Sequence, residues 1–462
     1  MRTLVLLVLL ALPSTASAAT VEVLRTSSAP PFGPALAGDE VVFGSFPAAK
    51  TADLLAVAPG GSPRRLLRAT SKPFGDPSLL AAATQGRVLA RVDYEGGASE
   101  LYGGALTGPL DKVESCSGSP DISFPPTPTL DGDLSAWSAS GCVRDRIQIQ
   151  LGASSRTVDA SGYVYGLAAA GRYVAWLSNQ PSGNPQVPDS RRLTVYDAQA
   201  GQVAYTLLLT PTDRLDVQAD GTVALTQPDL SGNRKPCYGS PPERVTYFTP
   251  AEPVAHTVPV SSCFDTVKIA AGSIAFVEHL PSGGDRLALT NLAGTQVQPI
   301  ARVEQQPTPT PDFDYDGTRV AWTQTRCRDY RLLRRDASDA SPEDPAVTCP
   351  VKVGSPRLSG DGTLHVAVSC PHGCRPEPGA SQQGIQVISP HWLHVRGKSR
   401  GVVRYSPFVK VDLRAGRRTV VRLPLTSHQR ALLRRHTHVS VRLKVLLQNV
   451  YLPRLVRQLR ST

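Results

Sequence analysis

Short apolar strings that end in an aromatic residue recur at a wide, nearly even spacing along this chain. The clearest copies are Ala136-Trp137, Val174-Ala175-Trp176 and Val320-Ala321-Trp322, and each follows a turn that contains glycine. Short strands repeated every 40 to 50 residues or so are typical of β-propellers, in which one repeat forms one blade. We therefore expect an all-β chain built around a β-propeller.

Seven copies of the repeat align on the last residue of the apolar string, which we call the anchor. The anchors are Phe43, Arg91, Trp137, Trp176, Leu225, Phe276 and Trp322. Successive anchors lie 48, 46, 39, 49, 51 and 46 residues apart, which is enough for four strands and their turns. The alignment predicts a seven-bladed β-propeller. Six or eight blades stay open, because a degenerate copy can hide or mislead.

A second alternating strand follows most anchors and begins with arginine, as in Arg146-Ile147-Gln148-Ile149 and Arg286-Leu287-Ala288-Leu289. Glycine or Asp-Gly before each anchor supplies the positive φ that a tight hairpin needs. This pattern, from about Val21 to Asp336, resembles the repeat of TolB-like β-propellers, which belong to the WD-type repeat proteins. The resemblance implies a fold and brings no catalytic residue with it.

The N-terminus has the features of a secretory signal peptide. A basic start is followed by an apolar run from Leu4 to Leu12 and by the small residues Ala16-Ser17-Ala18. We expect cleavage after Ala18, so that residues 1–18 are the signal peptide and the mature chain is secreted or extracytoplasmic, in the cell envelope. No later stretch is apolar enough for a transmembrane segment.

Charge divides the chain near residue 350. From Pro350 to Thr462 there are 20 Lys or Arg and three acids, a net charge of +17. Because the whole chain carries +11, the residues before Pro350 carry −6. Such asymmetry indicates an anionic partner for the basic part, for which we consider an anionic envelope polymer. Lipid head groups are a further candidate, sparse aromatic residues argue against nucleic acid, and the alternative to all of these is an ordinary solvated face.

The basic part has longer alternating strands and lacks the anchor repeat. Examples are Thr363 to Val368 and Val439 to Val445, and we expect a short helix at His428 to Arg435 capped by Ser427. With its Cys-x-x-x-Cys start, this part resembles the small Ig-like β-sandwich at the ends of many exported actinobacterial proteins. We therefore expect a β-propeller at residues 19–349 and a basic β-sandwich at 350–462.

An even number of cysteines in an exported chain indicates disulfides. The eight cysteines are Cys116, Cys142, Cys237, Cys263, Cys327, Cys349, Cys370 and Cys374. The repeat register places the first six on one propeller face, with sequence neighbours adjacent in space. It predicts the pairs Cys116–Cys142, Cys237–Cys263 and Cys327–Cys349, and we add Cys370–Cys374. A zinc site that uses Cys370, His372 and Cys374 is the alternative, although it offers three ligands where zinc prefers four.

Few residues carry a chemical signal. Asp312, Asp314 and Asp316 alternate before Gly317 and form a calcium candidate, although the glutamate that completes an EF-hand loop is missing. Turn chemistry explains most of this pattern, since Asp-Gly turns recur in other blades. The adjacent acid–histidine pair Glu278-His279 and the pair of histidines at 436 and 438 are weaker candidates for catalysis and metal binding. No other cofactor is expected.

These observations favour a binding or scaffolding protein that presents a propeller face to a protein or glycan partner. The longest insertions after anchor strands, Ser178 to Ser190 and Gln227 to Glu243, are the expected recognition loops. The alternative is a secreted polysaccharide hydrolase or lyase on the same scaffold. Acids converging on the central opening of the propeller would favour the enzyme.

Overall fold

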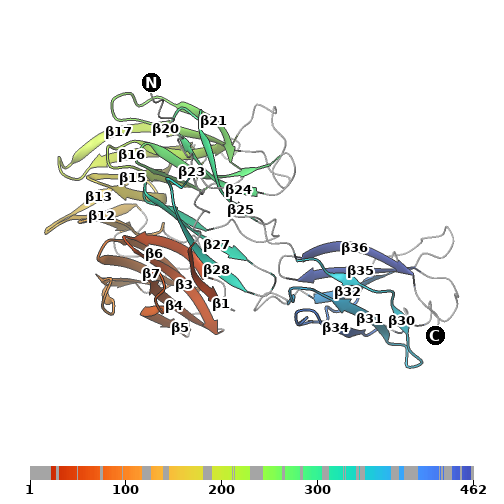
Figure 1. The fold of residues 1–462 in the computed structure, drawn as a ribbon. Helices are drawn as coiled ribbons and strands as arrows, with labels where there is room; N and C mark the ends of the chain where they lie inside the picture. The colour runs from red at the N-terminus through yellow and green to blue at the C-terminus, as the bar shows by residue number, and fades with distance from the viewer. Residues whose placement is uncertain are drawn as a thin grey trace, which may run out of the picture.

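A computed structural model shows two lobes, each built from β-strands (Figure 1). The structure describes residues 22–27, 31–48, 50–72, 76–95, 97–116, 126–138, 145–180, 190–210, 212, 214–228, 243–262, 266–280, 285–303, 312–325, 327, 329–339, 343, 349–375, 384–389, 404–425, 427, 430, 440–447 and 450–458. The predicted signal peptide and the predicted loop segments 181–189 and 229–242 lie outside these residues.

The larger lobe consists of seven four-stranded antiparallel sheets in the described part of residues 22–336, and the predicted β-propeller fold is confirmed. In order across each sheet, the strands are β2 (Pro31–Ala37), β3 (Glu40–Ala48), β4 (Thr51–Val57) and β5 (Arg64–Thr70); β6 (Pro77–Thr84), β7 (Arg87–Tyr94), β8 (Ser99–Ala105) and β9 (Asp111–Cys116); β10 (Thr129–Asp131), β11 (Leu134–Ser138), β12 (Arg146–Leu151) and β13 (Ser154–Asp159); β14 (Val164–Ala170), β15 (Tyr173–Gln180), β16 (Ser190–Asp197) and β17 (Gln202–Leu209); β18 (Leu215–Val217), β19 (Val223–Pro228), β20 (Glu243–Phe248) and β21 (His256–Ser262); β22 (Val267–Ala270), β23 (Ser273–His279), β24 (Asp285–Asn291) and β25 (Val297–Val303); and β26 (Phe313–Tyr315), β27 (Arg319–Thr325), β28 (Tyr330–Asp336) and β1 (Glu22–Ser27).

The last of these sheets closes the ring by joining the two ends of the propeller. Its outer strand is β1, which pairs antiparallel with β28 from Glu22 opposite Arg334 to Ser27 opposite Tyr330. The Arg334 guanidinium also forms an ion pair with the Glu22 carboxylate at 2.7 Å. Leu24 of β1 is buried in a cluster with Phe43 of β3 and Leu332 of β28, so β1 packs against the first blade as well as the last.

Every anchor residue lies in the second strand of its sheet and is buried, with 8% exposure or less. The alternation of the strands places apolar side chains between neighbouring blades. One buried cluster, for example, joins Ala175 and Val195 of the fourth sheet to Leu215 and Leu225 of the fifth. The repeat therefore marks the packing layer between blades, as the sequence predicts.

Arg91 is the one charged anchor, and the structure compensates its burial. Its Nε donates to both carboxylate oxygens of Asp93 at 3.0 and 3.1 Å, and its Nη1 donates to the Pro126 carbonyl at the start of the next blade. A buried charge is tolerated where it is paired and hydrogen-bonded. Arg91 thus adds polar contacts between the second and third blades to the apolar packing of Leu89 and Leu101 against Leu130 and Trp137.

The smaller lobe is a β-sandwich. Its first sheet contains β29 (Lys352–Val353), β30 (Arg357–Leu358), β31 (Leu364–Ser369) and β34 (Arg418–Leu423), and its second contains β33 (Arg404–Tyr405), β32 (Gly384–Ser389), β35 (Ser440–Leu447) and β36 (Val450–Gln458). Val366 and Val421 of the first sheet share one buried cluster with Val387 and Leu443 of the second. Of the predicted helix at His428 to Arg435, only Arg430 falls within the described residues.

Disulfides appear at two of the predicted positions. Cys327 is bonded to Cys349, and Cys370 is bonded to Cys374. The second bond uses both sulfurs that the zinc alternative needed as thiolates, so the structure corrects that alternative. Cys116 is also disulfide-bonded, whereas Cys142, Cys237 and Cys263 lie outside the described residues.

The Cys327–Cys349 bond joins the two lobes. Cys327 follows β27 of the propeller, yet both sulfur-bearing residues belong to the buried cluster of the β-sandwich. No helix in the described ranges has the length and apolar character to cross a membrane.

We expect Leu24→Ala to destabilise the propeller by about 2–4 kcal/mol, because it removes buried methyl groups from the seam that closes the ring. Val23→Ala is the matched control: Val23 lies in the same strand and is 44% exposed, so its truncation should cost less than about 0.5 kcal/mol. Urea unfolding followed by circular dichroism measures both. Equal losses in the two variants would contradict the role assigned to the seam.

We expect removal of the Cys327–Cys349 bond, by serine at both positions, to lower the free energy of unfolding by about 3 kcal/mol, because the bond closes a long loop. Its sequence separation is 22 residues, against 4 for Cys370–Cys374. The same replacement at Cys370 and Cys374 should cost less, about 2 kcal/mol. Guanidinium unfolding of the two double variants tests the order, and a larger loss for the short loop would contradict it.

Candidate functional site

A cavity of about 790 Å³ lies where the seven sheets meet. It is lined by the first strand of every sheet or by residues flanking that strand, namely β2, β6, β10, β14, β18, β22 and β26. These strands form the inner edges of the sheets, and several are only three residues long. The cavity is therefore the central channel of the propeller.

Inner-edge strands present backbone N–H groups that have no partner within their own sheet. Carboxylates of neighbouring blades satisfy several of them. Asp314 Oδ2 accepts from the N–H of Leu36 at 2.8 Å, and Asp216 Oδ2 accepts from the N–H of Ile269 at 2.8 Å. Asp131 Oδ2 makes a similar contact by accepting from the N–H of Gly171, in the turn after β14, at 2.6 Å. These carboxylates fasten one blade to the next around the channel.

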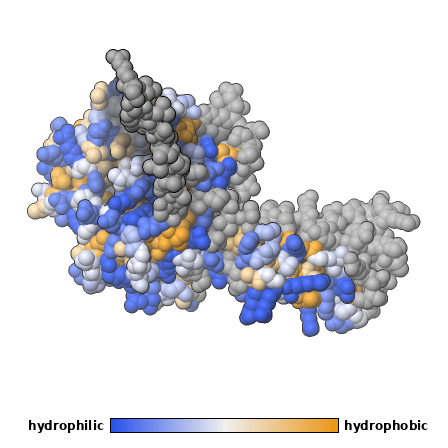
Figure 2. Space-filling view, viewed as in Figure 1, coloured by the Kyte–Doolittle hydropathy of each residue, from blue (hydrophilic) through white to orange (hydrophobic). Residues whose placement is uncertain are grey.

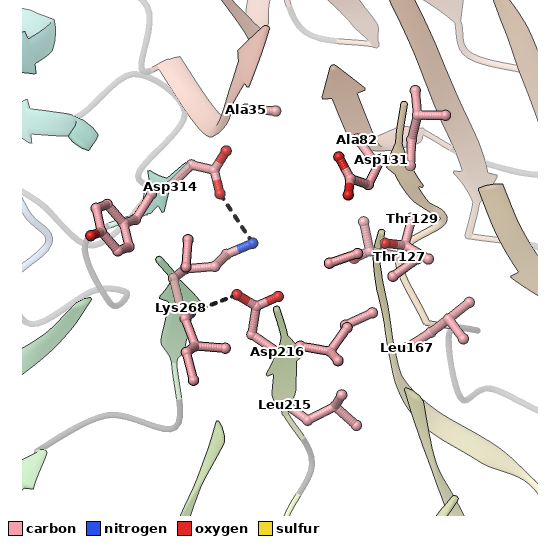
Figure 3. Close-up of a pocket in the computed structure, with 18 of the residues that line it drawn as sticks. Ala35, Ala82, Thr127, Thr129, Asp131, Leu167, Leu215, Asp216, Lys268 and Asp314 are labelled. Atoms are coloured by element: carbon pink, nitrogen blue, oxygen red, sulfur yellow. Dashed lines mark hydrogen bonds and ion pairs between the residues drawn. The ribbon is translucent and has the colours of Figure 1, made fainter. Parts of the chain in front are cut away.

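Lys268 lies between two of these carboxylates. Its Nζ is 3.1 Å from Asp314 Oδ1, and its side chain is 34% exposed. Figure 3 shows Asp314 and Lys268 pointing toward each other on one wall, with Asp216 close by and Asp131 on the opposite wall. The site therefore offers one amine and carboxylates from three different blades.

The charges of this cluster perturb one another. The negative charge of Asp314, assisted by that of Asp216, raises the pKa of the Lys268 amine. Burial raises the pKa of Asp216 to about 6, although Lys268 and the N–H of Ile269 oppose the shift. Lys268 thus stays protonated, whereas Asp216 exchanges a proton in the mildly acidic range.

The structure does not gather Asp312, Asp314 and Asp316 into a cation site. Asp312 Oδ2 accepts from the N–H of Gly33 at 2.9 Å, and Asp316 Oδ1 caps its own turn by accepting from the N–H groups at 318 and 319. Asp314 pairs with Lys268. Among the described residues, no group of three potential metal ligands lies together. The alternation that suggested calcium is explained by blade fastening and turn capping.

The weaker candidates either make structural contacts or lie outside the described residues. The carboxylate of Glu278 pairs across the strands with Arg286, whose Nε donates at 2.7 Å. This contact supports the interpretation of Glu278-His279 as part of a surface hairpin. The histidines at 436 and 438 lie outside the described residues.

A second cluster of charged groups surrounds Glu100 in the second blade. Its carboxylate accepts hydrogen bonds from the hydroxyls of Tyr94 and Tyr102, both at 3.0 Å, and forms ion pairs with Lys72 and Lys112. Burial opposes ionisation, but these donors lower the pKa of Glu100 to about 2. With four donors on one carboxylate, this cluster is a structural fastening between the first two blades.

Sequence reasoning missed Asp131, Asp216 and Lys268, because it was centred on the second strand of each blade. The inner strands β10, β18 and β26 are too short for a periodic signal. A weaker signal was present. An aspartate flanked by apolar residues precedes the turn in Leu215-Asp216-Val217 and in Phe313-Asp314-Tyr315.

No protein-family model matches the sequence, and no curated protein matches it. The chain is a β-propeller protein. Its structure is similar to puromycin hydrolase (15% identity, TM-score 0.42), with 77% of this chain covering 60% of that chain. It is also similar to the β-propeller domain of the Trilobed protease from Pyrococcus furiosus (13% identity, 67% of this chain, 96% of that chain, TM-score 0.44). A third similar structure is TolB from Acinetobacter baumannii (11% identity, 67% of this chain, 68% of that chain, TM-score 0.38).

We expect the raised pKa of Asp216 to make the propeller less stable as pH rises from 4 to 6. The folded state keeps this proton up to about pH 6, whereas the unfolded chain releases it near 3.8. The stabilisation is therefore complete below pH 4 and is lost as pH rises through 6. Asp216→Asn should reduce this fall in the free energy of unfolding, measured in urea at pH 4, 5, 6 and 7. The control Asp133→Asn, at a side chain that is 82% exposed, should leave the dependence of the unfolding free energy on pH unchanged. The same pH dependence in the unchanged protein and in both variants would contradict the raised pKa of Asp216.

Proposed function

We propose that this chain is an exported binding or scaffolding protein. Its propeller presents the open channel to a protein or glycan partner, and its basic β-sandwich contacts anionic polymer of the cell envelope. The observation that carries the proposal is the channel itself, a cavity of about 790 Å³ lined by all seven sheets. Cavities with a few well-placed polar groups on a rigid frame are typical of binding sites.

The chemistry of the channel wall suits hydrogen bonding to amides and hydroxyls. Lys268 supplies a donor, whereas Asp131 and Asp216 supply acceptors from different blades. One oxygen of each aspartate is held by a backbone N–H of the next blade, so the other oxygen has a fixed position. A partner that enters therefore meets preorganised groups, which lowers the cost of binding.

Export is supported by the signal-like N-terminus and by the disulfides. Disulfide bonds persist in oxidising compartments outside the cytoplasm. The two bonds at Cys327–Cys349 and Cys370–Cys374 are compatible with an extracytoplasmic protein.

A polysaccharide hydrolase or lyase is the second candidate, and one observation favours it. Asp216 has a pKa of about 6 and lines a cavity that also contains Asp131. A carboxylic acid with a raised pKa and a second carboxyl group in the same cavity are the pair of groups that glycoside hydrolysis uses. Against it, each of these carboxylates already holds a structural hydrogen bond between blades.

The binding proposal is tested by using the mature full-length protein to capture components from a solubilised envelope fraction. Thr127, an exposed residue of the channel wall, is changed to Trp to narrow the channel, and we expect capture to fall at least tenfold. The matched control is Thr107→Trp in an exposed turn outside the channel, which should capture as the unchanged protein does. Equal capture by both variants would contradict binding through the channel.

The enzymatic alternative is tested by the release of reducing ends from wall and plant polysaccharides. Release that disappears in Asp216→Asn, while the variant keeps its fold by circular dichroism, would establish the enzyme and overturn the binding proposal. No release by the unchanged protein, together with channel-dependent capture, supports binding.

A further inference from the structure

The outward face of the first sheet of the β-sandwich carries an unusual set of side chains. In β34 the exposed positions alternate as Arg418, Val420 and Arg422, while Val421 and Leu423 point into the core. In β31 the same alternation turns Leu364, Val366 and Val368 inward. The other side chains of these strands therefore share the outer face.

The strand register builds this face into rows. His365 of β31 lies opposite Arg422 on one side and Arg357 of β30 on the other. Ser369 lies opposite Arg418 on one side and Lys352 of β29 on the other. Directly opposed residues of antiparallel strands point to the same face. We call the resulting surface the basic face, and its members are Lys352, Arg357, His365, Ala367, Ser369, Arg418, Val420 and Arg422.

The basic face has cations at two ends and an apolar row between them. The row of Arg357, His365 and Arg422 is separated by four strand positions from the row of Ser369 and its neighbours, a distance of about 13 Å. Between them lies Ala367 opposite Val420, whose side chain is 58% exposed. In Figure 2 the corresponding lower surface of the smaller lobe is largely hydrophilic with a small hydrophobic area.

The cations of the basic face differ in their pairing from many of the arginines of the propeller. Ion pairs within the propeller include Arg64–Glu40, Arg68–Asp53, Arg91–Asp93, Arg172–Asp197, Arg286–Glu278, Arg319–Asp39, Arg334–Glu22 and Arg335–Asp339. By contrast, Lys352, Arg357, Arg418 and Arg422 form no ion pair with any residue that the structure describes. Asp361, in the turn between β30 and β31, accepts instead from the N–H of Thr363 at 2.9 Å and from Ser359.

We propose that the basic face binds an extended polyanion whose phosphate or carboxylate groups bridge its two cationic rows. This inference rests on the role of the β-sandwich in the proposed function and assigns that role to one surface. A guanidinium group can donate to two oxygens of a phosphate or carboxylate at once, and four cations without ion pairs on one small sheet favour a partner with many negative charges.

The composition of the face favours a polymer over a membrane or a nucleic acid. Membrane-bound surfaces insert several large apolar or aromatic side chains, whereas among the described residues of this face only Val420 is large, apolar and exposed. The members of this face include no Phe, Tyr or Trp, the large aromatic side chains on which bases stack most readily. An extended anionic chain needs neither feature, because charge pairing supplies its affinity.

The test uses the mature full-length protein and long-chain inorganic polyphosphate as the probe. Binding is measured by biolayer interferometry at 50, 150 and 500 mM NaCl. In the R357Q/R418Q/R422Q variant we expect at least tenfold weaker binding at 50 mM. We also expect the slope of log affinity against log salt to become shallower by about 2, because fewer counterions are released.

The matched control is R65Q/R146Q/R156Q, which removes the same charge from exposed positions of the propeller and should bind polyphosphate as the unchanged protein does. Equal affinities of the two triple variants, or binding that 500 mM NaCl does not weaken, would overturn the proposal. Tighter binding to vesicles that contain phosphatidylglycerol than to polyphosphate would overturn it in favour of a membrane.

Binding through the channel and polyanion binding by the basic face can be contradicted independently of each other. Thr127→Trp should keep polyphosphate binding, and R357Q/R418Q/R422Q should keep capture through the channel. Loss of polyphosphate binding in Thr127→Trp would contradict the assignment to the basic face, whereas failed channel capture with intact polyphosphate binding leaves this inference supported.

Discussion

The unpaired inner edges of seven small sheets impose the constraint on which the rest of this molecule depends. Each first strand turns one edge toward the channel, where its N–H groups need acceptors. Asp216 and Asp314 provide them from the neighbouring blade, and Asp131 accepts in the same way from the turn after β14. The same carboxylates then require a cation, and Lys268 supplies it. The charged character of the channel thus follows from how the blades are joined, and a partner would use groups that the fold has already fixed in place.

Charge serves opposite purposes in the two lobes. In the propeller, arginines such as Arg334 and Arg335 form ion pairs with carboxylates of the same lobe and so help to hold its strands together. In the β-sandwich, Arg418 and Arg422 project from a sheet whose other side buries apolar residues such as Val366, Val421 and Leu423. The disulfide between Cys327 and Cys349 sits in the core beneath that sheet and ties it to the last blade. Several arginines of the ring therefore pair within the fold, whereas those on the outer face of the first β-sandwich sheet point to solvent.

The sequence predicted which residues pack between the blades, but it did not predict most of the charged residues that line the channel. Anchors such as Trp176 and Trp322 recur because every blade buries the same position, and burial leaves a periodic apolar pattern. The inner strand Leu215–Val217 leaves no such pattern, because three residues are too few to show a period. The role of Asp216 comes instead from a hydrogen bond to Ile269 of another blade. For the same reason Asp312, Asp314 and Asp316 resembled a cation loop: spacing along the chain does not reveal that each carboxylate faces a different partner.

The pairing of β1 with β28 also fixes the order in which the ring can be completed. The ion pair between Glu22 and Arg334 spans 312 residues. Strand β1 therefore cannot pair until β28, the last strand of the propeller, has been synthesised. Until then both strands present free edges, and free edges accept strands from other chains. Two open rings that exchanged β1 would form every contact of the closed ring between them. A domain-swapped dimer is thus the natural by-product of slow closure, and its yield should rise with the concentration at which the chain refolds.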